Sequence, residues 1–579
     1  MSQNPFEYEA ASNLSPDDVL AFYTEDFNYS RFVRSKRNII LVGERGTGKS
    51  MALRFNSLAV SQRKAIREKV GLDLGVVCVY VPCQTPLLRR PDAQLLTEFL
   101  ADVISEHYLV LSIMHAVVKD LREVAGLLDG VDSSLLQKEL EIVWEAKLPS
   151  GNTVLDSLDL FFQQQAAKSQ KAMNARQPDA YYEDAWSFSS GIIPLLNVLR
   201  KIPRLANSHF VFMIDDAHWL NEQQMRAICS WLSYRDNSIF SFKVAMAKAD
   251  QPALVTRNGG GILDGHDYIQ VDMEQPYQNK DSDFAQFARS IVARRLDKIG
   301  LKIAPEDFFP EHPAVAKEVE GYKVTLRQHA ESEHPDWKQK QITDYVYRHA
   351  RANYFKNRQP KANLPIYAGF DTLVHVSTGV IRNLLEPCYW MYDKVVSELN
   401  AAGAKTSKVE NIPPAIQSQV LIERSRRKWE WMRDQLGKGY EECTEEEGRR
   451  IYKLFDNLAI LFKKRLSEHA SEPRAITFTI SEVDSAEYQH LKKLLQIARK
   501  AQLLYSYTSS AKDSGKREEY FVPNRILCPE RGLDPHGQHA RVSIKASHLW
   551  DAAQNNREIP FAPAAEKSQA ELGFNYDSN

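Results

Sequence analysis

Eight residues near the N-terminus carry the pattern with the clearest chemistry. They read Gly43-Glu44-Arg45-Gly46-Thr47-Gly48-Lys49-Ser50, which is Gly-x-x-x-x-Gly-Lys-Ser. Glycines allow the backbone to curl so that successive N–H groups face phosphate oxygens, and a following helix adds its positive end. Lys49 would reach the β- and γ-phosphates, and the Ser50 hydroxyl would hold Mg²⁺. We therefore predict that these eight residues bind a nucleoside triphosphate, ATP, together with Mg²⁺.

A pair of acids forms the second chemical pattern, 166 residues beyond Lys49. The apolar run His209–Ile214 predicts a buried strand, and Asp215 and Asp216 follow it directly. Asp215 would hold the Mg²⁺ shell through water, and Asp216 would orient or deprotonate the attacking water. We predict that Lys49, Asp215 and Asp216 carry catalysis, and that Ser50 and Asp215 bind the metal.

Five apolar, β-branched runs predict the strands that position these residues. A helix-compatible run, 51–60, follows the glycine loop, and other helical segments join the strands. This order predicts an α/β fold with a mainly parallel sheet, in which ligands bind at the carboxyl ends of the strands. The loop and the acidic pair both fall at such ends. The predicted strands are 39–42, 76–81, 209–214, 241–247 and 268–272.

Long helical stretches interrupt and follow this predicted core. We expect a core over residues 1–280 with a helical insertion at about 91–175, and a helical lid over 281–400 with an insertion at about 303–363. Ser377-Thr378-Gly379 precedes an apolar helical run and predicts a capped helix start. Arg382 lies one turn beyond Gly379.

The C-terminal third predicts a winged helix over residues 411–550. The expected order is a helix (444–466), a strand (475–480), a helix (486–500) and a two-stranded ribbon (503–508 and 520–522), followed by a tail over 551–579. The module holds 24 Lys and Arg against 19 Asp and Glu, a net charge of +5. The basic residues suit phosphate contacts with double-stranded DNA, although a solvated face on a protein-binding module is the open alternative. They are Lys492, Lys493, Arg499 and Lys500 on the second helix, and Lys512, Lys516 and Arg517 in the wing.

Composition limits the class of protein. The 579 residues have a formal net charge of −1, so any surface for nucleic acid must be local. The six cysteines are scattered without zinc-type spacing, which indicates reduced thiols in a cytosolic protein. The apolar segment 108–118 is too short and too polar to span a bilayer, and no signal peptide is visible. We expect a cytoplasmic protein without a membrane partner.

The glycine loop, the Asp-Asp strand end and Gly379-x-x-Arg382, in this order, resemble the AAA+ and STAND ATPases, and most closely their origin-recognition-type branch. The resemblance covers about residues 38–396, apart from the two insertions, and extends to the C-terminal module. It implies a five-stranded core, a helical lid whose Arg382 points at the γ-phosphate, a C-terminal winged helix and homo-oligomers. In that group an arginine from a neighbouring subunit can complete the site, and Arg257 or Arg235 would be candidates here.

Some residues depart from the family pattern. Many AAA+ members carry Asp-Glu where this chain has Asp215-Asp216, and we expect slow turnover because the second acid is one methylene shorter. The polar sensor residue expected after Ala247 is replaced by Lys248 or Asp250. His218 could order the loop after Asp216, or it could be a hydrogen-bonded structural histidine.

Two functions fit these patterns. The first is a slow ATPase that acts as a nucleotide-dependent switch and engages DNA through its winged helix, in replication or in antiviral defence. The second is a STAND-like scaffold that forms oligomers on ATP binding and recruits an effector protein.

Overall fold

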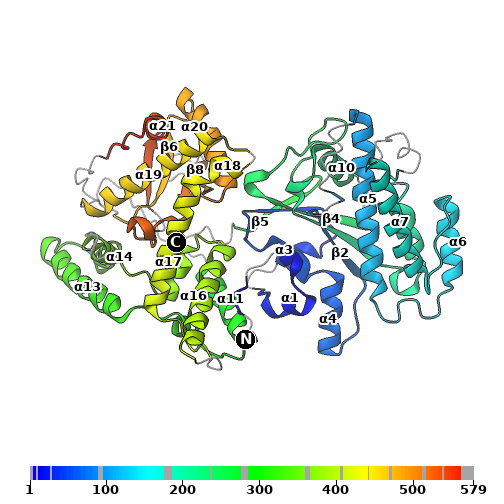
Figure 1. Cartoon of the computed structure of the whole chain (residues 1–579), viewed down its shortest axis with the longest axis horizontal. Helices are drawn as coiled ribbons and strands as arrows, with labels where there is room; N and C mark the ends of the chain where they lie inside the picture. The colour runs from blue at the N-terminus through cyan, green and yellow to red at the C-terminus, as the bar shows by residue number, and fades with distance from the viewer. Residues whose placement is uncertain are drawn as a thin grey trace. The chain divides into compact units, whose positions relative to one another are not determined.

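A computed structural model of the chain divides into two compact units. One unit is Glu9–Gln275, and the other combines Met1–Tyr8 with Pro276–Asn579 (Figure 1). The chain therefore passes between the units twice. The structure describes residues 4–7, 11–25, 29–85, 87–88, 96–174, 185–234, 238–274, 284–358, 365–403, 408–440, 442–468, 473–510, 517–537 and 540–561.

A five-stranded sheet forms the centre of the first unit, as predicted. Its strand order is β2-β3-β4-β1-β5 and every neighbouring pair is parallel. Because the strands are parallel, the ends of β1 and β3, which precede the glycine loop and the acidic pair, reach the same edge. The strands are β1 (Ile39–Gly43), β2 (Val76–Pro82), β3 (His209–Asp215), β4 (Phe240–Ala247) and β5 (Ile269–Asp272).

The run 51–60, expected to form one helix after the glycine loop, is divided between two helices. Helix α3 (Lys49–Phe55) ends at Asn56, and α4 (Leu58–Glu68) begins after Ser57, whose hydroxyl accepts a hydrogen bond from the Val60 N–H. A serine with such a bond is a typical N-cap. Other helices of the unit are α1 (Pro16–Phe22), α2 (Ser30–Val33), α9 (Ile192–Leu199) and α10 (Glu222–Leu232).

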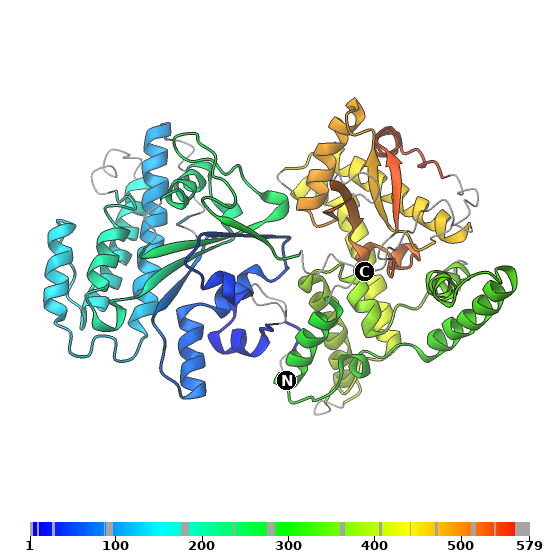
Figure 2. The same cartoon turned by 180° about the vertical axis from the view of Figure 1, so that it is seen from behind.

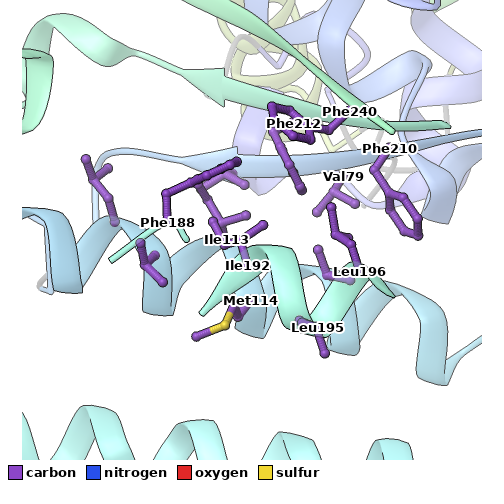
Figure 3. Packing of buried hydrophobic residues seen from close by; sticks show 14 of the residues in the cluster. Val79, Ile113, Met114, Phe188, Ile192, Leu195, Leu196, Phe210, Phe212 and Phe240 are labelled. Atoms are coloured by element: carbon purple, nitrogen blue, oxygen red, sulfur yellow. The ribbon is translucent and has the colours of Figure 1, made fainter. Parts of the chain in front are cut away.

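Three long helices build most of the predicted insertion. Helix α5 (Glu98–Arg122) contacts β2, α7 (Val154–Asn174) packs beside α5, and α6 (Ser133–Val143) contacts α7 (Figure 1). Figure 3 shows Phe212 and Val79 of the sheet facing Ile113 of α5 and Leu196 of α9. By length and composition α5 could cross a membrane, but 72% of its apolar window is buried. Its burial is that of a core helix.

Lys243 anchors the segment that leads into β1. It is fully buried on β4, and its ammonium donates to the carbonyls of Ser35 and Arg37 and to the Ser241 hydroxyl. These bonds fix the chain just before the strand that carries the glycine loop. Burial, the dominant cause, lowers the pKa of Lys243 to about 7.

Replacement of Lys243 by methionine tests this anchor. The unfolded lysine has a pKa of about 10.4, so between pH 7 and 10 the unfolded chain binds a proton that the folded chain lacks. The free energy of unfolding should then rise with pH by roughly 1 kcal/mol per unit more in the wild type than in Lys243→Met. Denaturant unfolding at pH 7, 8 and 9 measures the difference, with Lys119→Met, an exposed lysine of α5, as the control. Parallel pH profiles for wild type and Lys243→Met would contradict the lowered pKa of Lys243.

Helices and a short N-terminal segment form the first part of the second unit. Phe6 is fully buried against Phe308, Phe309 and Tyr392, and the Arg295 guanidinium donates to the carbonyls of Pro5 and Glu7. The N-terminal residues thus pack into the core of the second unit. The helices are α11 (Phe284–Lys298), α12 (Pro305–Phe308), α13 (Pro313–Glu333), α14 (Gln339–Lys356), α15 (Phe370–Val376) and α16 (Ile381–Ala401).

The predicted insertion at 303–363 contains a helical hairpin. Helices α13 and α14 pack against each other and carry their own small apolar cluster of Ala330, Ile342 and Val346 (Figure 2, green). The hairpin also contacts the C-terminal module, because the Arg474 guanidinium lies 4.8 Å from the ring centroid of Tyr347.

The cap predicted at Ser377-Thr378-Gly379 is wrong, although a helix does begin directly after these residues, at Ile381. These residues form the turn between α15 and α16, and Thr378 and Gly379 both have positive φ, at 58° and 77°. The N-cap of α16 is Val380, which makes no side-chain cap bond. The Ser377 hydroxyl instead donates back to the Val374 carbonyl at 2.6 Å. Thr378 and Gly379 lie within the apolar run but adopt left-handed backbone conformations, so they separate α15 from α16.

The C-terminal module has a four-stranded sheet of order β7-β8-β6-β9. The strands are β6 (Thr477–Ser481), β7 (Leu504–Ser510), β8 (Arg517–Pro523) and β9 (Arg541–Lys545); β9 pairs in parallel with β6 and was not predicted. The helices are α17 (Pro414–Asp434), α18 (Leu436–Gly439), α19 (Glu445–Ser467), α20 (Ala486–Lys500) and α21 (Ala546–Asn555). One helix, α20, connects β6 to β7, and α21 packs against both α19 and α20.

The predicted boundary between the module and a tail at residue 550 falls inside α21. Leu549, Ala552 and Ala553 are buried in the module's core, and Ile559 is 4% exposed. Packing therefore continues to at least Ile559, because the apolar face of α21 completes the core. The wing residues Lys512 and Lys516 lie outside the described residues, as does the side chain of Arg517.

Candidate nucleotide-binding site

The glycine loop adopts a tightly curled backbone. Gly46 and Gly48 have φ of 91° and 101°, which favour glycine over any residue with a side chain. A Cβ on Gly43 would lie 2.9 Å from the Thr47 hydroxyl oxygen, which itself donates to the Glu44 carbonyl. The glycines are therefore required by local geometry.

Lys49 lies at the centre of this loop. Its Nζ donates to the carbonyls of Gly43 and Glu44 at 2.8 and 2.9 Å, and the residue is 5% exposed. An ammonium has three protons, so one N–H is left for a phosphate oxygen. Burial lowers the pKa of Lys49, and nearby carboxylates, led by Asp215, oppose that shift.

The acidic pair lies beside the loop. The Ser50 hydroxyl lies near enough to the Asp215 carboxylate to lower its pKa, and the Tyr80 hydroxyl donates to Asp215 Oδ2 at 2.6 Å. Burial, and then the neighbouring Asp216, raises the pKa of Asp215 to about 6. Asp216 has a left-handed backbone, with φ of 56°, and its N–H donates to Asp215 Oδ1 at 3.0 Å. The structure thus brings together Lys49, Ser50, Asp215 and Asp216.

Two further residues at this edge were missed from the sequence. Tyr80 lies near the carboxyl end of β2, and Glu274 follows β5 by two residues. Glu274 Oε1 accepts the Glu44 N–H at 3.1 Å, and Lys248 pairs with Asp272 at 2.9 Å and with Glu274 at 3.6 Å. Each is a polar residue at the carboxyl end of a strand, which is the signal that would have found it.

Arg45 belongs to the glycine loop, and His218 follows the acidic pair by two residues. Arg45 pairs with Asp250 at 2.9 Å and covers the ring of Trp219 at 5.0 Å. Among the described residues, neither ring nitrogen of His218 has a hydrogen-bond partner, although both are buried. Burial lowers the pKa of His218 to about 4, so the ring is neutral at pH 7. The interpretation of His218 as a hydrogen-bonded structural residue is therefore wrong for the described part of the chain.

The arginines considered for the site have different positions. Arg257 donates to Asp102 at 3.0 Å and to Glu106 at 2.6 Å, so its guanidinium stabilises α5 of its own chain. Arg235 lies outside the described residues. Arg382 is in the first turn of α16 and belongs to the second unit. Its role at the γ-phosphate stays a prediction.

The basic face predicted on α20 is partly neutralised. Lys493 pairs with Glu447 and Lys500 pairs with Glu442, both at 2.5 Å. Lys492 is exposed and Arg499 is half-buried. Lys492 and Arg499 are consequently the two residues of this set with no acidic partner among the described contacts.

The donor set fits a magnesium nucleotide. A curled glycine backbone and a buried ammonium suit the phosphates, and a hydroxyl in contact with a carboxylate offers the oxygen ligands that Mg²⁺ prefers. The buried Asp215 carboxylate is costly without a cation, as its raised pKa indicates.

Comparison with known proteins agrees with this geometry. A family profile described as ORC-CDC6-like matches residues 4–544 of the chain. No curated protein matches the chain.

Proposed function

The chain belongs to the ORC-CDC6-like family of AAA+ initiator-type ATPases, and from this premise we propose that it is a slow ATPase that works as a nucleotide-dependent switch. The observation that carries the proposal is the contact between Ser50 and Asp215 behind a glycine loop centred on Lys49. Mg²⁺ held by Ser50 and Asp215 would neutralise phosphate charge, and Lys49 would bind the β- and γ-phosphates. Asp216 would take the proton of the attacking water.

The lid would transmit the nucleotide state to the C-terminal module. Arg382 lies at the start of α16, and three contacts join this region to the module. Val380 packs with Tyr505 and Val522, and the Asn383 amide donates to the Tyr505 hydroxyl at 2.9 Å. The Arg525 N–H donates to the Thr378 hydroxyl at 2.9 Å. A shift of α16 caused by the γ-phosphate would therefore move the module with it.

Double-stranded DNA is the partner that we propose for the module. Lys492 and Arg499 are available for phosphates on α20, whereas Lys493 and Lys500 are engaged by glutamates. A modest affinity follows, because only a few phosphates would be neutralised. We propose a cytoplasmic location and a role in replication or in antiviral defence.

A DNA titration at two salt concentrations, with ATP or ADP, tests this proposal. Lys492→Glu combined with Arg499→Glu should weaken binding and reduce the slope of log affinity against log salt by about 2, since two phosphate contacts are lost. The control makes the same charge change on α13, with Lys317→Glu and Arg327→Glu, both exposed. Equal losses in the two double variants would show a general charge effect and would contradict the assigned face.

A STAND-like scaffold is the second candidate, and the ion pairs that the α20 lysines form with glutamates outside α20 favour it. Ion pairs with Glu447 and Glu442 remove two of four positive charges from the proposed DNA face. A scaffold would form homo-oligomers when ATP binds and would recruit an effector protein. Size measurement with ATP and with ADP distinguishes the candidates: ATP-dependent oligomers without measurable DNA affinity would favour the scaffold.

A further inference from the structure

Three potential metal ligands meet in the second unit, in a cluster that the proposed nucleotide chemistry does not use. Asp371 and His375 lie one turn apart on α15, and His536 lies on the segment that precedes β9. One ligand atom from each residue lies within 4.8 Å of the others. The i, i+4 spacing places Asp371 and His375 on one face of the helix.

One separation in this cluster suits a shared ion. Asp371 Oδ2 lies 3.5 Å from His536 Nε2, whereas His375 Nδ1 donates to the Asp371 backbone carbonyl at 2.9 Å, which leaves Nε2 as the nitrogen of His375 that can bind a metal. Tetrahedral Zn²⁺ with bonds of about 2.0–2.1 Å separates neighbouring ligand atoms by about 3.3–3.5 Å. Direct N–H···O hydrogen bonds are shorter, at about 2.7–3.2 Å. The Asp371–His536 pair is therefore too far apart for a good hydrogen bond and is spaced for a metal between its two atoms.

A buried carboxylate orients His536. Asp534 is 2% exposed, and its Oδ1 lies 2.6 Å from His536 Nδ1 and 3.0 Å from the His536 backbone N. This bond assigns the proton to Nδ1 and leaves the lone pair of Nε2 facing Asp371. A carboxylate behind a histidine is the usual support of a metal-bound imidazole.

One cation competes for the same lone pair. Arg351 Nη1 lies 3.0 Å from His536 Nε2, while Nη2 of the same guanidinium donates to Glu311 at 3.0 Å. The Nε2 lone pair can accept from Arg351 or bind a metal, but it cannot do both. Metal binding thus requires the Arg351 guanidinium to move away from His536 Nε2. Its ion pair with Glu311 can hold the guanidinium after that move.

We propose that Asp371, His375 and His536 form a three-ligand site for one Zn²⁺ ion, with water in the fourth position and Asp534 as the support of His536. Two imidazoles and a carboxylate match the ligand preference of zinc. The ion would fasten α15 to the segment around residue 536, which the Tyr367 hydroxyl already joins through the Leu533 carbonyl at 3.0 Å. It would stiffen the connection between the helix that precedes Arg382 and the C-terminal module.

Zinc titration of the full-length, chelator-treated protein tests the site. Calorimetry should give one Zn²⁺ per chain, and Co²⁺ in place of zinc should give the visible absorption of a tetrahedral complex. His375→Ala and Asp371→Asn should each lower zinc affinity at least about 10-fold. Asp371 can be changed without opening the core as His536 would, since its side chain is 66% exposed. The His375 side chain is 10% exposed, so the fold of His375→Ala is checked by its thermal unfolding. His329→Ala, an exposed histidine on α13, is the matched control and should bind zinc normally.

Arg351→Gln provides a measurement that a purely structural network would not reproduce. Removal of the competing cation should tighten zinc binding severalfold in this variant. Weaker or unchanged zinc binding in Arg351→Gln would contradict the assignment of His536 Nε2 as a zinc ligand. The proposal also fails if the wild type binds no stoichiometric zinc, or if His375→Ala and Asp371→Asn bind it as the wild type does.

Discussion

Alanine in place of Lys49 is expected to lower the affinity for ATP by about 10- to 100-fold, the range for loss of a charged hydrogen bond to phosphate. Lys49 is buried at the centre of the loop, and its ammonium also holds the carbonyls of Gly43 and Glu44. The variant therefore loses both a phosphate contact and the bonds that keep the loop curled. Calorimetry with a slowly hydrolysed ATP analogue and Mg²⁺ measures the effect.

The control for Lys49 is Lys201→Ala, which removes a lysine paired with Glu139 on the surface of the same unit. It should bind the analogue as the wild type does. Unfolding measurements on Lys49→Ala separate a lost ligand contact from a lost fold. A folded Lys49→Ala protein with wild-type affinity would refute the assignment of the loop as the phosphate site.

Much of the nucleotide site could be predicted because its determinants are local. The curl from Gly43 to Ser50 is set by glycines within eight residues, and the buried strands before the loop and before Asp215 are continuous apolar runs. Parallel pairing then brings the loop and Asp215 to one edge without further information. This is why the five-stranded sheet and the meeting of Ser50 with Asp215 were both expected.

Long-range contacts account for what the sequence did not reveal. Tyr80 and Glu274 reach the site from the ends of β2 and β5, and neither belongs to a local motif. Strand β9 pairs with β6 across more than fifty residues, so no hairpin signal marks it. A serine and a threonine before an apolar run favour a helix cap, which is why the sequence predicts one at Ser377-Thr378-Gly379. The Thr378 hydroxyl instead accepts a hydrogen bond from the N–H of Arg525, far along the chain.

Asparagine in place of Asp216 is expected to lower ATP turnover by about 100- to 10,000-fold while ATP affinity stays near that of the wild type, because a general base contributes a factor of this size. Asp216 has a left-handed backbone, and asparagine tolerates that conformation, so the variant removes the carboxylate without backbone strain. Phosphate release under single-turnover conditions measures the chemical step.

Glycine at position 216 supplies the matched comparison. Asp216→Gly also removes the carboxylate and also accepts a φ of 56°, whereas alanine at this position would add strain of about 1–2 kcal/mol. If Asp216 is the base, the asparagine and glycine variants should lose turnover alike and both should retain ATP binding. Turnover that survives in both variants would remove Asp216 from the chemistry and leave Mg²⁺, held by Ser50 and Asp215, and the loop itself as the source of any catalysis.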